Sequence, residues 1–386
     1  MIIPYARQDI NNEDIDAVIA VLQSDFLTQG PMIPAFEQAI ASYCQSKYAL
    51  ATNSATSALQ LVYLAMDLGE GDWLWTSPNT FVATSNAALH CGANVDFVDI
   101  DKATYNLCPQ ALEQKLIQAE LDGNLPKIVV PVHFAGQSCD MKRIYDLAQY
   151  YGFKIVEDAS HALGGKYEQQ MIGNCAFSEA TVFSFHPVKI ITSGEGGMIV
   201  SNDPQLMERI SLLRSHGTTR DENLMTQASP GAWYYEQLAL GFNYRMTDLQ
   251  AALGLSQSNR LNDFIDKRHK LAARYNEGLG PLPLTLPFQA PQCYSAFHLY
   301  VIRLHLEQLA SSRAEIFAAL QQEGINVNVH YIPAHLQPYY QQLGFRAGMF
   351  PVAEQYYEEA ISLPMYPKLN AEQQDKVIHI LEKIVQ

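Results

Sequence analysis

The chain has 386 residues, 48% of them hydrophobic and 17% charged, which is long enough for two domains that share a cleft. Its 25 basic and 40 acidic residues give a formal net charge of −15, which disfavours binding to nucleic acid. No run of about 18 apolar residues and no signal-peptide pattern is present, so we expect a soluble, cytoplasmic protein that does not enter a membrane. Six cysteines without a CxxC pair predict neither a metal site nor a disulfide framework.

Short apolar runs alternate with helical patterns from about residue 49 to residue 200, which is typical of a mostly parallel sheet between helices. The predicted strands are Tyr48–Ala51, Trp73–Thr76, Val95–Val98, Ile128–Val132, Lys154–Glu157, Thr181–Phe185 and Met198–Ser201. The predicted helices between them are Ser57–Met66, Phe81–His90, Pro109–Ala119 and Met141–Tyr151. This part of the chain therefore predicts an α/β fold with a seven-stranded sheet.

The pattern changes after Gly241. Helix Thr247–Gln257 and a charged helix around residues 260–279 are followed by the proline-rich segment GPLPLTLPFQAPQ. Beyond it, the segments His298–Arg303 and Val327–Tyr331, the helix Arg313–Glu323 and two terminal helices predict a smaller α+β unit. We therefore expect a large domain at residues 1–245 and a small domain at residues 246–386.

Three motifs follow predicted strands: NSATSAL at 53–59, VEDASHALGGKY at 156–167 and SFHPVKIITSGEGG at 184–197. Ligands of open parallel sheets bind outside the carboxyl ends of the strands, so we expect the three motifs to meet at one site. In NSATSAL, hydroxyl residues open a helix, where free backbone N–H groups suit a phosphate. A plain Ser or Thr N-cap is the alternative interpretation.

Asp158 and Lys189 are the candidate catalytic residues. Asp158 ends a very apolar strand, where a carboxylate needs a cation or a strong donor, and a protonated pyridine nitrogen is one such cation. An Asp that caps the following helix is the alternative. Lys189 is flanked by apolar residues and followed by glycines, and partial burial would lower its pKa and favour imine chemistry. A snorkelling lysine is the alternative for this position.

The ordered segments PYARQDI, LTQGPMIPAFE, NSATSAL, PNTFVATSNA, EDASHALGGKY, SFHPVKIITSGEGGM and GFNYRMTDLQAALG resemble the DegT/DnrJ/EryC1/StrS sugar aminotransferases over nearly the whole chain. The resemblance implies a fold-type-I, pyridoxal-phosphate-dependent (PLP-dependent) transferase. It also implies a homodimer whose active sites are shared between subunits. A PLP-dependent dehydratase branch carries a His at the Schiff-base position, and Lys189 therefore favours transamination.

The resemblance also implies roles for individual residues. Lys189 forms the Schiff base, Asp158 pairs with the pyridine nitrogen, Phe81 stacks on the ring, and His161 lies near it. The implied phosphate contacts are Ala55, Thr56, Ser184 and, from the neighbouring subunit, Asn243. By composition alone, Phe81 would be a core aromatic and Asn243 a loop-capping residue.

Within the family, the segments LTQGP, SFHPVKIITSGEGG and VHYIPAHLQPYY resemble the aminotransferases of the pseudaminic-acid pathway. These enzymes use L-glutamate and UDP-4-keto-6-deoxy-N-acetylaltrosamine or a similar UDP-amino-sugar. This resemblance implies substrate contacts at Tyr5, Asp25, Phe26, Leu27, Thr28, Ala55 and Ser184. A dTDP-, GDP- or other UDP-sugar, and a non-catalytic regulator that binds PLP or a nucleotide sugar, are the alternatives. Arg214, Arg220 and Arg245 are the candidates for gripping the diphosphate.

Overall fold

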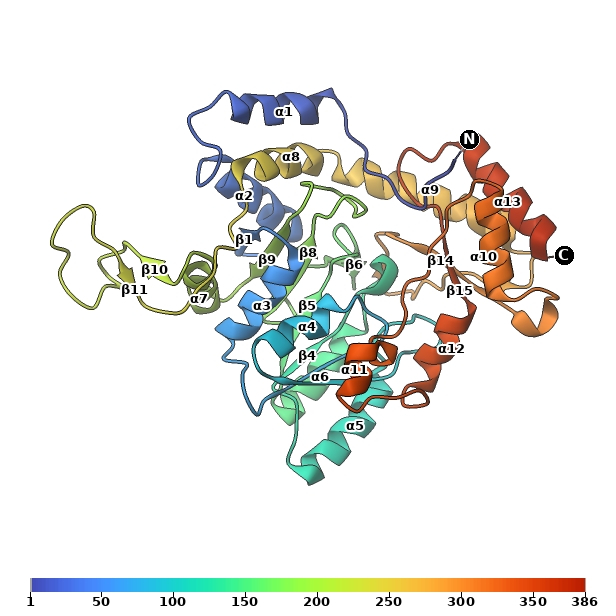
Figure 1. The fold of residues 1–386 in the computed structure, drawn as a ribbon, viewed down its shortest axis with the longest axis horizontal. Coiled ribbons are helices and arrows are strands. Elements are labelled where there is room, and N and C mark those ends of the chain that lie inside the picture. The colour runs from blue at the N-terminus through green and yellow to red at the C-terminus, as the bar shows by residue number, and fades with distance from the viewer. Residues whose placement is uncertain (1, 386) are drawn as a thin grey trace.

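A seven-stranded sheet forms the centre of the computed structural model, which describes residues 2–385 (Figure 1). Its strands are β1 (Tyr48–Thr52), β2 (Trp73–Thr76), β3 (Asn94–Phe97), β4 (Ile128–Val130), β5 (Lys154–Asp158), β8 (Ala180–Ser184) and β9 (Gly197–Ser201). They lie in the order β1-β9-β8-β5-β4-β2-β3, and only β9 runs antiparallel to its two neighbours. The predicted α/β class and the mostly parallel sheet are confirmed.

Helices cover both faces of this sheet, which is why its central strands are almost continuously apolar. They are α3 (Ala55–Ala65), α4 (Ala83–His90), α5 (Pro109–Asp122), α6 (Met141–Tyr151) and α7 (Pro204–Arg214). The first four correspond to predicted helices, and α3 begins two residues earlier than expected because Ser54 is its N-cap. The chain thus reaches α3 directly from the end of β1.

Two helices that the sequence analysis did not assign begin the chain: α1 (Asn12–Leu22) and α2 (Met32–Cys44). Both pack against α8 (Asp248–Ser258), and Figure 1 shows the three together at one end of the molecule. Asp14 is fully buried at this junction, where its carboxylate accepts hydrogen bonds from Gln257 and Ser256 and pairs with Arg260. The N-terminal segment is therefore fixed to the rest of the fold.

The C-terminal part contains a three-stranded sheet, β12 (Leu284–Thr285), β14 (Tyr300–Leu304) and β15 (Ala360–Leu363). Its helices are α9 (Leu261–Leu279), α10 (Arg313–Gln322), α11 (Pro338–Gln342), α12 (Pro351–Glu359) and α13 (Ala371–Val385). Tyr340 and Phe350 pack against Phe97 of the large sheet, so this part is tied to the large core. We propose that the large domain ends at residue 245, so that α8 and α9 belong to the small domain.

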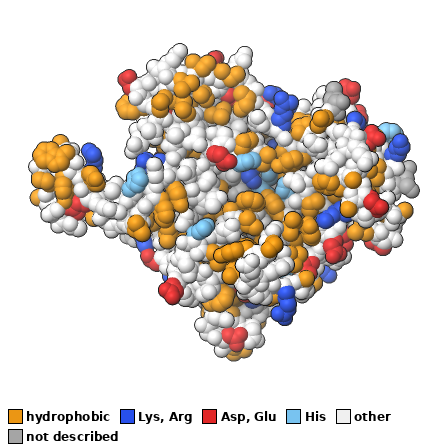
Figure 2. Space-filling model, viewed as in Figure 1, with side chains coloured by type: hydrophobic (Ala, Val, Ile, Leu, Met, Phe, Trp, Pro, Cys, Tyr) orange, Lys and Arg blue, Asp and Glu red, His pale blue; other side chains and the backbone are white. Residues whose placement is uncertain are grey.

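Two small sheets complete the fold: β6 (Lys166–Tyr167) with β7 (Gln170–Met171) and β13 (Cys293–Tyr294), and β10 (Thr218–Thr219) with β11 (Glu236–Gln237). The segment 217–240, which we call the arm, projects away from the body in Figure 1. Trp233 is 73% and Leu240 86% exposed, and Figure 2 shows hydrophobic side chains gathered on the tip of the arm. In residues 2–385, no helix has the length and apolar character needed to cross a membrane.

Candidate active site

A cavity of about 570 Å³ lies at the carboxyl ends of β1, β5 and β8. Those three strands are parallel, so the segments that follow them meet at one edge of the sheet, as the sequence predicted. The cavity is lined by eight of the predicted residues: Tyr5, Ala55, Thr56, Phe81, Asp158, His161, Ser184 and Lys189.

Asp158 is the carboxylate at the end of β5, and it is 5% exposed. One carboxylate oxygen accepts the hydroxyl proton of Thr84 at 2.7 Å, and the other accepts the backbone N–H of Ser160 at 3.1 Å. Within residues 2–385 no cationic side chain forms an ion pair with it. A buried carboxylate that has no cationic partner suits a cationic ligand atom, such as a protonated ring nitrogen.

Glu157 precedes Asp158, and its side chain points to the opposite face of the strand because side chains alternate along β5. Its carboxylate lies 2.6 Å from the Nε2 atom of His133 and accepts the hydroxyl of Ser178 at 2.5 Å. Burial by itself would raise the pKa of Glu157, but these hydrogen bonds hold that pKa below its usual value. Of the two adjacent carboxylates, only Asp158 therefore serves the cavity.

Lys189 lies in the loop after β8, and its backbone N–H donates to the carbonyl of His186 at 2.9 Å. Its side chain retains partial exposure through the cavity mouth. Burial among protein atoms lowers the pKa of the amine from 10.5 to about 8, and the negative charge of Asp158 opposes this shift. A larger fraction of neutral amine at neutral pH suits a lysine that attacks a carbonyl carbon.

The first turn of α3 forms the phosphate-sized end of the cavity. Ser54 caps the helix by accepting the N–H of Ser57 at 3.1 Å, whereas the N–H groups of Ala55 and Thr56 have no partner inside the helix. Gly197 of β9 lies against this turn, where a Cβ atom would sit 2.5 Å from the carbonyl oxygen of Ser54. The close approach of β9 fixes an anion-binding helix terminus beside Lys189.

His161 and Phe81 line the cavity with Tyr331, a residue that the sequence analysis did not single out. The Nδ1 atom of His161 accepts the N–H of Ala135 at 3.3 Å, so its proton lies on Nε2, 3.0 Å from the Tyr331 hydroxyl. Burial, with smaller effects of Lys189 and His330, holds the pKa of His161 well below its usual value. The ring is therefore neutral. Phe81 is 61% exposed, so its ring is accessible to a ligand.

Sequence reasoning missed several lining residues, among them Thr84, Ser160, Asn328, His330 and Tyr331. Thr84 lies within the quoted segment PNTFVATSNA, and that position was the available signal for it. Its contact with Asp158 joins residues 74 positions apart, and the contact of Tyr331 with His161 joins residues 170 apart. A local sequence pattern cannot predict contacts between residues so far apart in the chain.

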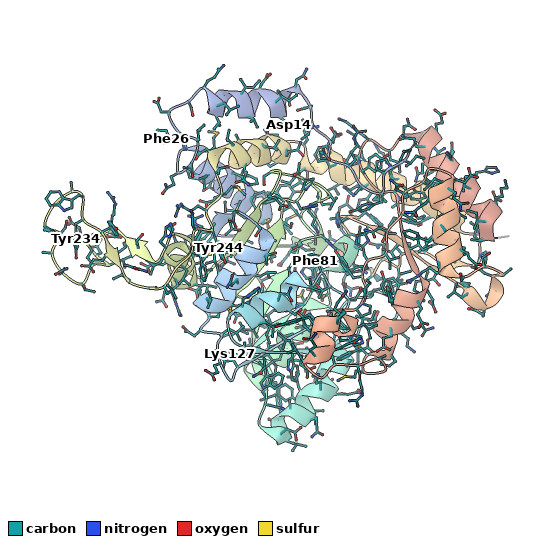
Figure 3. All side chains as sticks on the ribbon, in the orientation of Figure 1. Asp14, Phe26, Phe81, Lys127, Tyr234 and Tyr244 are labelled. Atoms are coloured by element: carbon teal, nitrogen blue, oxygen red, sulfur yellow. The ribbon has the colours of Figure 1, made fainter. Side chains whose placement is uncertain are left out.

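Five predicted residues lie outside this cavity. Asp25, Phe26, Leu27 and Thr28 are exposed in the loop between α1 and α2, where the Leu27 carbonyl accepts the N–H of Asp248 at 3.0 Å. Asn243 forms an isolated bridge with Ser215 near the base of the arm. Figure 3 shows Phe26 well apart from Phe81. Their assigned roles stay predictions.

Among residues 2–385, no arginine lines the cavity. Three arginines were predicted as candidates for binding the diphosphate. Arg214 is already paired within the protein, because one of its guanidinium nitrogens lies 2.8 Å from the carboxylate of Glu37 and donates to the carbonyl of Ala51 at 2.7 Å. Arg220 is exposed on the arm and has no ion-pair partner within residues 2–385. Arg245 is half-buried, and its Nε atom has no hydrogen-bond partner in that range.

These residues fit pyridoxal phosphate: a lysine with a depressed pKa, a buried carboxylate without a cation, a free aromatic face and a helix terminus for phosphate. Together with the sheet order, they define a fold-type-I, PLP-dependent transferase. The DegT/DnrJ/EryC1/StrS aminotransferase family model matches residues 8–382, and the chain belongs to this family. The predicted family, enzyme class and cofactor are confirmed.

Several relatives match over nearly their whole length. The chain is 40% identical to the spore coat polysaccharide biosynthesis protein SpsC of Bacillus subtilis, covering 99% of this chain and 97% of that protein. It is 36% identical to the UDP-4-amino-4,6-dideoxy-N-acetyl-β-L-altrosamine transaminase of Campylobacter jejuni, covering 99% and 98%.

Among solved structures, Helicobacter pylori PseC, an aminotransferase involved in the biosynthesis of pseudaminic acid, matches with a TM-score of 0.90 at 33% identity, covering 100% of this chain and 99% of that one. The PLP form of the Streptococcus pneumoniae sugar aminotransferase Spr1654 matches with a TM-score of 0.89 at 29% identity, covering both chains fully.

Proposed function

We propose that this enzyme transfers the amino group of L-glutamate to the 4-keto carbon of UDP-4-keto-6-deoxy-N-acetylaltrosamine, giving the 4-amino sugar of pseudaminic acid biosynthesis. The observation that carries the chemistry is the meeting of Lys189, with its depressed pKa, and Asp158 in one cavity. The C. jejuni relative and the PseC structure support the choice of sugar. A regulator that only binds the ligand would not need a lysine with this property.

Each lining residue has a role in this proposal. Bound pyridoxal phosphate supplies an electron sink for the electrons released when a proton leaves the amine-bearing carbon. Lys189 would hold the cofactor covalently, and its Nζ atom, when free, would take and return that proton. Asp158 would keep the ring nitrogen protonated, Phe81 would supply a face for the ring, and His161 would lie near it. Ala55, Thr56 and Ser184 would bind the phosphate.

We propose a homodimer with shared active sites. The exposed arm, with Trp233 and Leu240 facing solvent, supports it, because side chains of this kind are enriched where proteins meet partners. Asn243 of the partner subunit then completes the phosphate site, and Asp25–Thr28 of the partner subunit reach the sugar nucleotide beside Tyr5. This assignment agrees with their position outside the cavity of their own chain.

A diphosphate suits a guanidinium partner, and among residues 2–385 no arginine lines the cavity of one subunit. We assign this role to Arg220 of the partner subunit, because Arg214 is held by Glu37, Arg245 is half-buried, and Arg220 is exposed on the arm without an ion-pair partner within residues 2–385. Arg220→Gln should therefore raise the KM for the nucleotide sugar more than the KM for glutamate. Arg209→Gln is the matched control, since Arg209 pairs with Asp67 on the exposed surface of α7.

A second candidate substrate is another nucleotide-linked 4-keto sugar, because the 40% identity to SpsC exceeds the 36% identity to the altrosamine transaminase. The test is a panel of UDP-, dTDP- and GDP-linked 4-keto sugars with glutamate, in which mass spectrometry detects the amino-sugar products. Preferred turnover of UDP-4-keto-6-deoxy-N-acetylaltrosamine supports the proposal. Preferred turnover of another sugar would move the assignment to that sugar, and the absence of any amino sugar would contradict a transaminase.

A further inference from the structure

The side chain of Thr84 reaches the active-site cavity from the first turn of α4 and contacts Asp158. Thr84 is 1% exposed, and its hydroxyl lies 2.7 Å from the Oδ2 atom of Asp158. The Oδ1 atom accepts the N–H of Ser160 at 3.1 Å. Each carboxylate oxygen thus has one donor from the protein, which fixes the orientation of the carboxylate. A carboxylate has about four acceptor positions, so others stay open to a ligand.

A second buried hydroxyl stands behind Thr84. The Thr84 hydroxyl lies 2.9 Å from the hydroxyl of Thr80, which is 2% exposed. An ionised carboxylate only accepts hydrogen bonds, so Thr84 uses its single proton for Asp158. The proton between the two hydroxyls is then that of Thr80, and the chain of donors runs from Thr80 through Thr84 to Asp158. Hydrogen bonds in such a chain polarise and strengthen one another.

The backbone at Thr84 is also held in place. The hydroxyl of Tyr63, in α3, donates to the carbonyl of Thr84 at 3.2 Å inside the core. Phe81 stands three positions before Thr84, so the beginning of α4 carries both an exposed aromatic ring and a buried hydroxyl. This one segment therefore contributes to both the ring face and the carboxylate of the cofactor site.

We propose that Thr84 is a positioning residue for the transamination and acts through Asp158. The inference rests on the proposed function, in which Asp158 pairs with the ring nitrogen of the cofactor. A hydrogen bond from a hydroxyl is stronger to an ionised carboxylate than to a neutral carboxylic acid. Thr84 therefore favours the arrangement in which Asp158 stays ionised and the shared proton lies on the ring nitrogen.

The same hydrogen bond favours the reaction. Asp158 loses part of its cationic partner whenever the ring takes up electrons, because the ring nitrogen then becomes less positive. The buried carboxylate must at that point be stabilised by its donors from the protein, which are Thr84 and Ser160. Loss of the Thr84 hydroxyl should therefore slow the removal of the proton from the amine-bearing carbon without weakening the binding of glutamate.

The test compares three variants of the cofactor-loaded enzyme. Thr84→Val keeps the branched shape of the side chain and removes the hydroxyl, whereas Thr84→Ser keeps the hydroxyl. Thr76→Val is the matched control, because Thr76 is also fully buried and its hydroxyl donates at 2.7 Å to the carbonyl of Val130 rather than to Asp158. Rapid mixing measures the glutamate half-reaction, and 15N NMR of cofactor labelled at the ring nitrogen reports where the shared proton lies.

The Thr84→Val variant should carry out the glutamate half-reaction about tenfold more slowly, at an unchanged half-saturating concentration of glutamate. Its 15N resonance should move toward that of an unprotonated ring. The Thr84→Ser and Thr76→Val variants should match the wild type in both measurements. An unchanged resonance in the Thr84→Val variant would overturn the proposal, and so would an equal loss of rate in the Thr76→Val variant.

A double variant separates this inference from the role of Asp158 itself. In the Asp158→Asn background no carboxylate charge is left for the hydroxyl to stabilise, so Thr84→Val should cause little further loss of rate. A further tenfold loss in that background would overturn the proposal. If Asp158→Asn alone leaves the rate and the 15N resonance unchanged, the proposed role of Asp158 is wrong, whatever the Thr84→Val variant shows.

Discussion

Replacement of Lys189 by Met tests whether this lysine is held in an environment that disfavours its charge. Met keeps a long unbranched side chain but has no amine. The pKa of Lys189 falls from 10.5 to about 8 on folding, and a shift of this size corresponds to about 3 kcal/mol of unfolding free energy. Below pH 8 the amine is charged in both the folded and the unfolded cofactor-free protein. The unfolding free energy is then lowered by the whole cost of burying that charge. The penalty declines between pH 8 and pH 10.5 and disappears above that range.

The cofactor-free Lys189→Met variant should therefore be more stable than the wild type by up to about 3 kcal/mol at pH 7 and equally stable near pH 10.5. Urea unfolding at equal subunit concentration measures both values, since the stability of the proposed dimer would depend on concentration. Lys142→Met is the control: Lys142 is 58% exposed beside Asp146, and a surface pair of this kind contributes about 0–1 kcal/mol. The Lys189 variant should also lose turnover.

Equal stability of the two proteins at pH 7 would refute the reasoning, and so would a stability difference that persists at pH 10.5. The covalent assignment has its own check. Borohydride reduction of the loaded wild type followed by peptide mapping should place the pyridoxyl group on Lys189. Finding it on another lysine would show that the wrong residue has been assigned.

Three further predictions concern the other site residues. The Asp158→Asn variant should still bind the cofactor, but both half-reactions should be slower. The reason is that a neutral amide stabilises the protonated ring nitrogen less than a carboxylate does. Rapid-mixing kinetics that show an unchanged glutamate half-reaction would contradict this prediction. Mixing inactive Lys189→Ala subunits with inactive Asn243→Ala subunits should restore activity, since one site of each heterodimer then carries neither defect. If heterodimers are confirmed and activity is absent, Asn243 does not act in the site of the partner subunit. Tyr331→Phe should lower the unfolding free energy by about 1–2 kcal/mol, because the buried N–H of His161 loses its acceptor, and an unchanged urea midpoint would speak against that hydrogen bond.

The positions of the strands along the chain and the main site were predictable because their signals are local. Short apolar runs predicted the strands of the large sheet, and the motifs at the ends of β1, β5 and β8 predicted Thr56, Asp158 and Lys189 as site residues. In a parallel sheet the carboxyl ends meet at one edge, so order along the chain was enough to bring these residues together. Asp158 and Lys189 by themselves only suggested pyridoxal phosphate, and the family resemblance then identified it as the cofactor.

Other parts of the site depended on the tertiary structure. The segment 327–331, predicted as part of the smaller α+β unit, forms an isolated bridge from Asn328 to Ser362 and brings Tyr331 to His161. The arm was likewise absent from the sequence reasoning. So was the packing of α11 on α4, which joins Tyr340 to Asn86 between elements distant in the chain. The sequence by itself determined the chemistry at the strand ends, because a strand and the turn after it are continuous in the chain. Only the packing of the C-terminal segments decided which side chains surround that chemistry, because contacts between residues 170 or 254 positions apart leave no periodic trace in the sequence.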